Sequence, residues 1–163
     1  MYIIFVNMIK KKLIDNLKKN NLKLCVAESI TGGRFSSEII KIKGASSFLD
    51  LSIISYSNDS KHTFYSLKKK IHTFGVVSSE VAEQMAKKVV SFSNKKNRIG
   101  ISCTGLASKI ENSGGIKVGT VFIGIFYKKK VKVIKKEYDE KKTRNQIILA
   151  TTSEMFYQAN SIF

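Results

Sequence analysis

Short apolar runs alternate along the chain with longer segments in which apolar residues recur at helical spacing. The runs lie at 22–27, 51–56, 98–103, 118–126 and 131–138, and their length predicts β-strands. Helical spacing is found at 8–20, in a segment ending near 42, from about 60, from 78, and at 142–160. The clearest stripe predicts a helix packed on the core and consists of Val81, Ala82, Met85, Ala86, Val89 and Val90.

The order of these elements predicts a three-layer α/β/α sandwich with a mixed sheet. Strands alternate with helices over most of the chain, and a lysine turn at 128–130 joins the last two strands as an antiparallel hairpin. No linker or repeat interrupts the pattern, so residues 1–163 are expected to form a single domain. Ligands in such folds bind at the carboxyl ends of strands, here where the loops after Ala27, Tyr56 and Cys103 converge.

The segment from Glu28 to Gly33 is predicted to be a turn between the first strand and the following helix. That helix presents Phe35, Ile39 and Ile40 on one side. The two glycines of the turn permit close approach of the backbone to a ligand, and the helix N-terminus offers N–H groups to an anion. A hydroxyl in such a turn can serve as a nucleophile. The residue types alone fit a tight turn with a Thr31 cap equally well.

The composition fits a globular protein without a membrane-spanning segment. Hydrophobic residues make up 43% and charged residues 25% of the chain, and no apolar run approaches the ~20 residues that a bilayer requires. The apolar start at Met1–Val6 is short and lacks a positive leader, unlike a signal peptide. Cys25 and Cys103 fall in predicted strands, which indicates reduced, buried thiols and a cytoplasmic protein. Neither they nor His62 and His72 have metal-ligand spacing, so no metal or other cofactor is expected.

The formal net charge of +17 suggests an anionic ligand. Of the 29 basic residues, however, only Arg34, Arg98 and Arg144 are arginine, the side chain that reads bases and binds phosphate in bidentate fashion. The lysines are scattered, and together with frequent Ile, Asn and Ser and no proline they favour a genome-wide compositional bias. Nucleic-acid binding therefore ranks below attraction of a phosphorylated small molecule by electrostatic steering.

Three loops contain the side chains that could carry chemistry: 28–33, 56–61 and 104–115. They supply hydroxyls, a phenol and an amine, which permits Ser–Lys catalysis but not a Ser-His-Asp triad unless His62 turns inward. A buried lysine loses hydration, its pKa falls, and its neutral amine can accept a proton from a serine hydroxyl. Tyr56 could relay that proton or donate to an oxyanion. Tyr56 and Lys61 also resemble a dehydrogenase pair, but they are five residues apart and no GxGxxG accompanies them.

Taken together, the loop motifs are more specific than any one of them. The segments concerned are Ala27-Glu28-Ser29-Ile30-Thr31-Gly32-Gly33, Gly44-Ala45-Ser46-Ser47, Ser55-Tyr56-Ser57-Asn58-Asp59-Ser60-Lys61, Gly75-Val76-Val77-Ser78 and Val118-Gly119-Thr120-Val121. In order and spacing they resemble the CinA C-terminal domain family. From about residue 8 to 160 the chain is similar to the stand-alone nicotinamide-nucleotide amidases of that family, which lack the N-terminal domain of full-length CinA proteins.

This resemblance implies hydrolysis of the carboxamide of nicotinamide mononucleotide to nicotinate mononucleotide and ammonia. It makes Ser29 the nucleophile, Lys61 its base and Tyr56 the residue that orients or relays. Substrate contacts are implied for Thr31, Gly32 and Gly33, for Thr104 and Gly105 of the third loop, and for Arg144 as a phosphate partner. Glu28 is either an acceptor that supports the substrate-binding residues from behind or a structural carboxylate. Arg34 lies next to the motif and receives no role.

Two positions depart from the family pattern. Ile30 stands where the family commonly has cysteine, a change that concerns packing more than chemistry. In the third loop, the family's Ala-Gly-Pro followed by glycines is replaced over residues 107–115, which alters the backbone options of that turn. The altered loop leaves a second hypothesis, a nucleotide-binding module that has lost catalysis. A homo-oligomer, most simply a dimer, is the default expectation for assembly.

Overall fold

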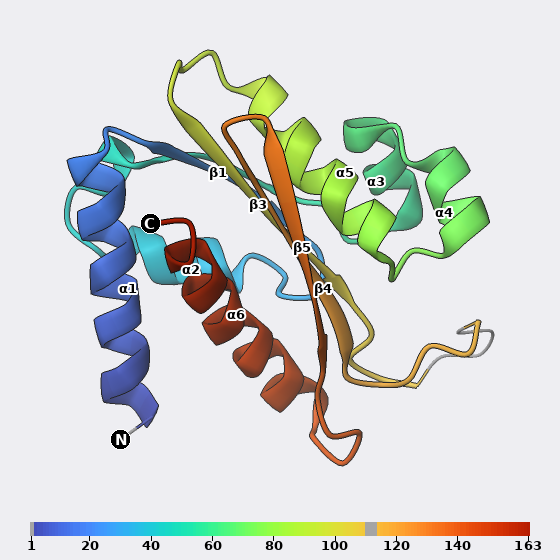
Figure 1. Ribbon diagram of the computed structural model, residues 1–163. Helices are drawn as coiled ribbons and strands as arrows, with labels where there is room; N and C mark the ends of the chain where they lie inside the picture. Colours follow the sequence, from blue (N-terminus) through green and yellow to red (C-terminus); the bar gives the residue numbers. More distant parts are fainter. Residues whose placement is uncertain (1, 110–113) are drawn as a thin grey trace.

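A five-stranded mixed sheet forms the centre of the computed structural model, which describes residues 2–109 and 114–163, the first four by their backbone (Figure 1). Its strands are β1 (Lys23–Glu28), β2 (Leu49–Ile54), β3 (Arg98–Gly105), β4 (Thr120–Tyr127) and β5 (Lys130–Glu137), in the order β2-β1-β3-β4-β5. The first three are parallel neighbours, and β4 and β5 continue the sheet antiparallel. The predicted mixed sheet and terminal hairpin are therefore confirmed.

Helices cover both faces of this sheet (Figure 1). One face packs against α1 (Tyr2–Lys19), α2 (Arg34–Ile40) and α6 (Arg144–Asn160), and the other against α3 (Asn58–Tyr65), α4 (Lys68–Phe74) and α5 (Ser79–Val89). Alternation along β1 produces the two cores: Leu24 and Val26 belong to the first, and Cys25 and Ala27 to the second. The three-layer α/β/α sandwich is confirmed, and the two cysteines are buried and unpaired with each other.

Several helix starts follow from capping residues visible in the sequence. The hydroxyl of Ser57 accepts a hydrogen bond from the Ser60 N–H at the start of α3, and Ser78 caps α5 in the same way. At α6, Thr143 and Gln146 form a capping box. The predicted helix from residue 60 is in fact two helices, because Ser66 adopts a left-handed conformation with φ of 56° and ends α3.

Two further boundaries differ from the prediction. α1 begins at Tyr2 rather than near residue 8. The helix predicted from 78, whose apolar stripe included Val90, ends at Val89 and is followed by a 3-10 turn at Val90–Phe92. No described helix is both long and apolar enough to cross a bilayer.

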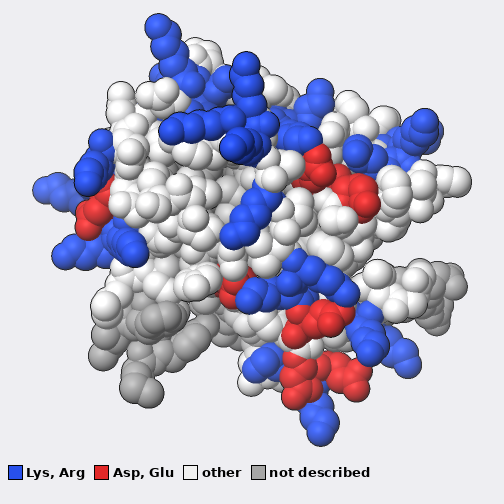
Figure 2. All heavy atoms as spheres, in the orientation of Figure 1, with Lys and Arg blue, Asp and Glu red and all other residues white. Residues whose placement is uncertain are grey.

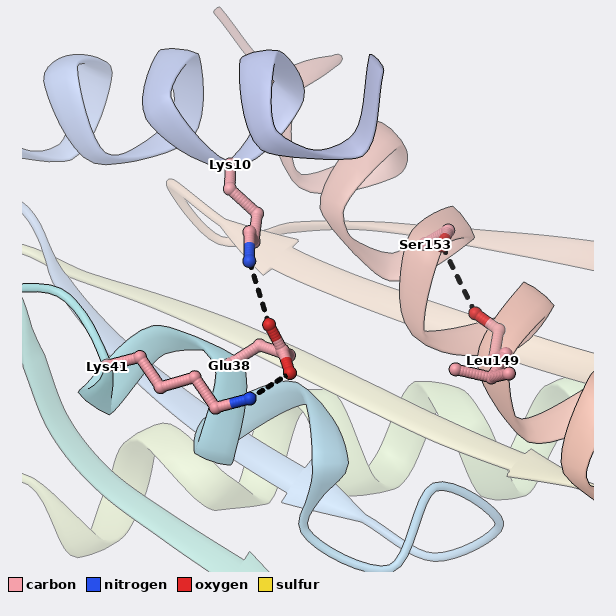
Figure 3. A network of polar contacts seen from close by, with 5 residues as sticks. All are labelled: Lys10, Glu38, Lys41, Leu149 and Ser153. Carbon is pink, nitrogen blue, oxygen red and sulfur yellow. Dashed lines mark hydrogen bonds and ion pairs between the residues drawn. The ribbon is translucent and has the colours of Figure 1, made fainter. Parts of the chain in front are cut away.

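An ion-pair network ties α1 to α2 near the start of the fold (Figure 3). Glu38 accepts hydrogen bonds from Lys10 at 2.8 Å and from Lys41 at 2.6 Å, and these two contacts lower the pKa of Glu38 to about 2. Elsewhere on α2, the rings of Phe35 and Phe156 lie 4.3 Å apart and join that helix to α6. This packing fixes the position of α2, the helix that follows the Glu28–Gly33 turn.

Candidate active site

A pocket of about 190 Å³ opens at the carboxyl ends of the parallel strands, where the loops were expected to converge. Its wall combines a hydroxyl, an amine, a phenol and a guanidinium with apolar side chains. The lining residues are Ser29, Ile30, Tyr56, Asn58, Lys61, Val76, Val77, Thr104, Gly105, Leu106, Ala107, Ser108 and Arg144. A second hollow of about 170 Å³ lies between α1, α2 and α6. Its one lysine, Lys10, is already paired with Glu38, so that hollow offers no uncommitted amine.

Ser29 is the first residue after β1 and lies at the pocket wall. Its side chain is 7% exposed, and within the described part of the chain its hydroxyl makes no hydrogen bond. The turn is closed behind it by a hydrogen bond from the Gly32 N–H to the Ser29 carbonyl at 3.1 Å. A hydroxyl held in this way is accessible to a ligand and uncommitted to the protein.

Glu28 organises the turn from inside the protein and does not line the pocket. Its carboxylate is fully buried and accepts hydrogen bonds from the Thr31 hydroxyl at 2.6 Å, the Gly33 N–H at 3.1 Å and the Phe35 N–H at 3.1 Å. The Ser36 N–H and hydroxyl donate to its second oxygen at 2.9 and 2.6 Å. With both oxygens occupied at the N-terminus of α2, Glu28 acts as a structural carboxylate, and a contribution to substrate binding stays a prediction.

Thr31, Gly32 and Gly33 support the turn rather than the pocket wall. The Thr31 side chain is 4% exposed and points to Glu28 and to the Cys103 sulfur, 3.1 Å away. Gly32 and Gly33 have φ values of 59° and 94°, and a Cβ on Gly33 would lie 2.6 Å from Ile54 Cδ1. These requirements explain the glycines without a ligand, and contact of these three residues with a substrate stays a prediction.

Lys61 enters the pocket from the first turns of α3 and is only 2% exposed. Its Nζ donates to the carbonyl oxygens of Ser55 at 2.9 Å and Tyr56 at 3.0 Å. Burial lowers the pKa of Lys61 to about 8, since desolvation disfavours the ammonium form. Among the described residues no hydrogen bond joins this Nζ to the Ser29 hydroxyl, although both groups line the same pocket.

Tyr56, Arg144 and Ser108 meet at the outer side of the pocket. Arg144 begins α6, and its guanidinium donates to the Tyr56 hydroxyl at 2.5 Å and to the Ser108 hydroxyl at 3.1 Å. The Tyr56 side chain is 62% exposed. Its hydroxyl therefore contacts Arg144 in this structure, and not Ser29 or Lys61 as the predicted relay would require.

Thr104 and Gly105 line the pocket as predicted, but they belong to β3 instead of a loop. The Thr104 hydroxyl donates to the Val76 carbonyl at 2.8 Å, which fixes the segment before α5 against β3. A Cβ on Gly105 would lie 2.8 Å from Ile30 Cδ1, so the glycine permits the close approach of the first loop.

Sequence reasoning missed several other lining residues, chiefly Val76, Val77, Leu106 and Ser108. The motif Gly75-Val76-Val77-Ser78 was a signal for the first two. Ser108 lies in the predicted loop 104–115, but no motif distinguished it from the other residues of that loop. Within residues 2–109 and 114–163 no cluster of metal-ligating side chains is present; residues 110–113 of the altered loop lie outside the described residues.

Comparison with known proteins gives one consistent family. The family model of the CinA C-terminal domain matches residues 6–162. A CinA-like protein of Fusobacterium nucleatum is 41% identical over 136 residues, which are 81% of this chain and 31% of that protein. A putative competence-damage inducible protein of Thermoanaerobacter pseudethanolicus is 32% identical over 152 residues, 91% of this chain and 36% of that protein. The chain thus spans about a third of the length of these curated relatives.

Solved structures of similar proteins have the same fold. A competence-damaged protein (CinA) superfamily protein of Escherichia coli has a TM-score of 0.90 at 18% identity, covering 97% of this chain and 90% of its own. A competence/damage inducible protein of Agrobacterium tumefaciens has a TM-score of 0.85 at 26% identity, covering 94% and 92%.

Proposed function

Because the chain belongs to the CinA C-terminal domain family, we propose that it is an amidase that hydrolyses the carboxamide of nicotinamide mononucleotide. The products are nicotinate mononucleotide and ammonia. Ser29 is the nucleophile and Lys61 the general base. The proposal joins the family resemblance of the loop motifs to the geometry of the pocket at the carboxyl ends of β1, β2 and β3.

The observation that carries the proposal is a buried lysine with a lowered pKa in the same pocket as an uncommitted serine hydroxyl. A neutral amine has two N–H bonds and one lone pair. The carbonyl oxygens of Ser55 and Tyr56 are placed to accept both N–H bonds of Lys61, which leaves the lone pair to take a proton. Hydrogen bonds between catalytic groups often tighten only when substrate is bound, so the missing Ser29–Lys61 contact is compatible with this role.

In the acylation half-reaction, the neutral Lys61 amine takes the proton of the Ser29 hydroxyl while the serine oxygen attacks the carboxamide carbon. The C=O becomes a tetrahedral oxyanion. Lys61, now an ammonium, returns the proton to the amide nitrogen, the C–N bond breaks, and ammonia leaves. What remains is an ester between Ser29 and the nicotinate carbonyl.

In the deacylation half-reaction, a water molecule replaces ammonia. Lys61 accepts a proton from the water as its oxygen attacks the ester carbon, and the proton then passes to the departing Ser29 oxygen. The net reaction adds one water to the amide and releases the acid and ammonia, with the protein unchanged. The Tyr56 hydroxyl accepts from Arg144 at the outer side of the pocket, so its own proton is available to a phosphate oxygen bound there.

The phosphate end of the substrate requires cationic and hydroxyl donors away from the nucleophile. Arg144 and the Ser108 hydroxyl supply both at the outer side of the pocket, 3.1 Å apart. A guanidinium binds phosphate oxygens in bidentate geometry, which would place the carboxamide end inward. In this arrangement the phosphate takes over the contacts that Arg144 now makes with Tyr56 and Ser108.

The test is ammonia release from nicotinamide mononucleotide by the purified protein, with product identified by chromatography. Ser29→Ala is expected to lower kcat by several orders of magnitude, as loss of a nucleophile does. Ser37→Ala, an exposed serine on α2, is the matched control and should keep full activity. Wild-type protein that is folded but releases no ammonia would remove the enzymatic assignment.

One observation favours the second candidate, a binding module without catalysis. The Ser108–Arg144 hydrogen bond is made by the loop that departs from the family pattern, and it occupies the predicted phosphate partner. If the protein is a binding module without catalysis, calorimetry would detect binding of nicotinamide mononucleotide while the ammonia assay stays at background. Turnover in the ammonia assay excludes this candidate.

A further inference from the structure

The end of the sheet opposite the pocket carries a concentration of positive charge. We define the basic rim as Lys23, Lys95–Lys96, Arg98 and Lys128–Lys130. These residues lie at the amino ends of β1 and β3 and at the turn between β4 and β5. In Figure 2 the uppermost band of the molecule, over the loop before β3 and the β4–β5 turn, is blue, while red side chains lie lower.

The sheet register places the rim cations in a row. Lys23 is the partner of Arg98 in the β1–β3 pair, and Lys130 is the partner of Tyr127 in the β4–β5 pair. Since Ile99 is the partner of Tyr127, one more step of the same antiparallel register brings Arg98 beside Lys128. Neighbouring strands are about 4.8 Å apart, so Lys23, Arg98, Lys128 and Lys130 form a row across four of the five strands. Within this row the Lys23 amine donates to the Ser47 carbonyl oxygen at 2.5 Å.

Within residues 2–109 and 114–163, no rim side chain forms an ion pair. The ion pairs of the described residues all lie elsewhere and involve Lys10, Lys41, Lys87, Lys135 and Lys136 with Glu38, Glu83, Glu137 and Glu154. Lys95, Lys96 and Lys128–Lys130 are exposed. The fold therefore gathers cations without ion-pair partners at one end, although they are dispersed along the sequence.

The turn between β4 and β5 holds two of the rim lysines in the left-handed backbone region. Lys128 and Lys129 have φ values of 48° and 64°, the left-handed region that two-residue hairpin turns fill with asparagine and glycine. Lysine nevertheless occupies both strained positions, where its side chain extends the row of cations.

The neighbours of the rim suit a nucleic-acid strand better than a lipid surface. Exposed Asn21, Asn94 and Asn97 surround it with amide donors that contact phosphate and sugar oxygens. Arg98 donates to the carbonyl oxygens of Val90 and Ser93, which ties the rim to the 3-10 turn that carries Phe92.

Phe92 supplies an aromatic surface beside the rim. Its side chain is 50% exposed, and the edge-to-face contact with Phe64, at 6.3 Å between centroids, holds the ring in place. One exposed aromatic beside a row of cations offers the two kinds of contact, base stacking and backbone charge, through which proteins bind single strands.

We propose that the basic rim binds single-stranded nucleic acid without sequence preference, with phosphates on the lysine row and a base on Phe92. The surface lies at the opposite end of the sheet from the pocket of Ser29 and Lys61. It is therefore independent of the amidase proposal, and binding there leaves the pocket open.

The test measures fluorescence anisotropy of a labelled oligothymidylate of about 15 nucleotides, a length that spans a typical single-strand site. Lys128–Lys130 replaced together by glutamine is the rim variant. Lys68–Lys70 replaced by glutamine is the matched control, because it removes the same charge from α4. At about 0.1 M salt the rim variant is expected to bind about tenfold more weakly, and its slope of log K against log salt should fall by about two. The control should change little.

Equal losses of affinity in the two lysine variants would show that the net charge of the protein, and not the position of the lysines, determines binding. That result would overturn the rim assignment.

Phe92→Leu should weaken binding of oligothymidylate but not of an abasic strand of the same length. An equal loss of affinity for both strands would exclude the stacking contact. Vesicles containing anionic lipid are the competing probe, and binding to them through the same lysines without oligonucleotide binding would also overturn the proposal. Circular dichroism verifies folding, and amidase assays on the rim variants, expected unchanged, keep the two proposals separate.

Discussion

At the scale of single residues, the central feature is the environment of Lys61. Its side chain is nearly inaccessible, its Nζ contacts two carbonyl oxygens, and desolvation lowers its pKa to about 8. The sequence predicted a buried lysine base at this position through the family resemblance. The carbonyl partners that orient the amine were not predictable, because they depend on how β2 ends beside α3.

The pH dependence of turnover follows from this environment. Because the base is the neutral amine, kcat/KM should rise about tenfold per pH unit below about 8 and level off above that value. Lys61→Arg, which stays protonated, should abolish the rise and most of the activity, whereas Lys69→Met, an exposed lysine on α4, should leave the profile unchanged. If kcat/KM of the wild-type protein does not change between about pH 6 and about pH 9, a range that includes the Lys61 pKa of about 8, Lys61 is not the general base.

At the scale of elements, the turn between β1 and α2 decides where Ser29 lies. Glu28 accepts five hydrogen bonds from the turn and from the first residues of α2. A carboxylate is the one side chain in this position that offers acceptors to all of these donors. The turn is thus held from inside the protein, while its serine faces the pocket.

Glu28→Gln is expected to lower the free energy of unfolding by about 1–3 kcal/mol, because an amide NH₂ would then face backbone N–H donors. Urea denaturation followed by circular dichroism measures the change. Glu140→Gln, an exposed glutamate with the same chemical change, is the control and should stay within about 0.5 kcal/mol of wild type. If the two variants prove equally stable, the turn does not depend on the Glu28 carboxylate.

The sequence predicted most elements because their signals are local. Neighbouring residues determine the strand lengths, the apolar stripe of α5 and the helix caps at Ser57 and Ser78. The predictions failed where a non-local requirement decided. The break at Ser66 has no glycine or proline to mark it, and Thr104 continues β3 because β4 pairs with it. The Tyr56–Arg144 contact joins residues 88 positions apart and leaves no pattern in the sequence.

At the scale of the whole molecule, the two ends of the sheet have different chemistry. The carboxyl ends hold the pocket with its hydroxyl, amine and guanidinium, and the amino ends hold the basic rim. The net charge of +17 describes the chain as a whole. The fold shows which lysines of the described residues form ion pairs, such as Lys10 and Lys87. In these two proposals, a phosphorylated substrate is attracted to the pocket, and a polyanion binds to the basic rim at the opposite end of the sheet.

The most direct measurement of the central claim, that Ser29 attacks the carboxamide and Lys61 activates it, is mass spectrometry of protein quenched during turnover of nicotinamide mononucleotide. An ester of nicotinate mononucleotide is expected on the peptide that contains Ser29, and it should be absent from Ser29→Ala and from protein without substrate. Steady ammonia release by a Ser29→Ala protein, with no acylated peptide in the wild type, would contradict it.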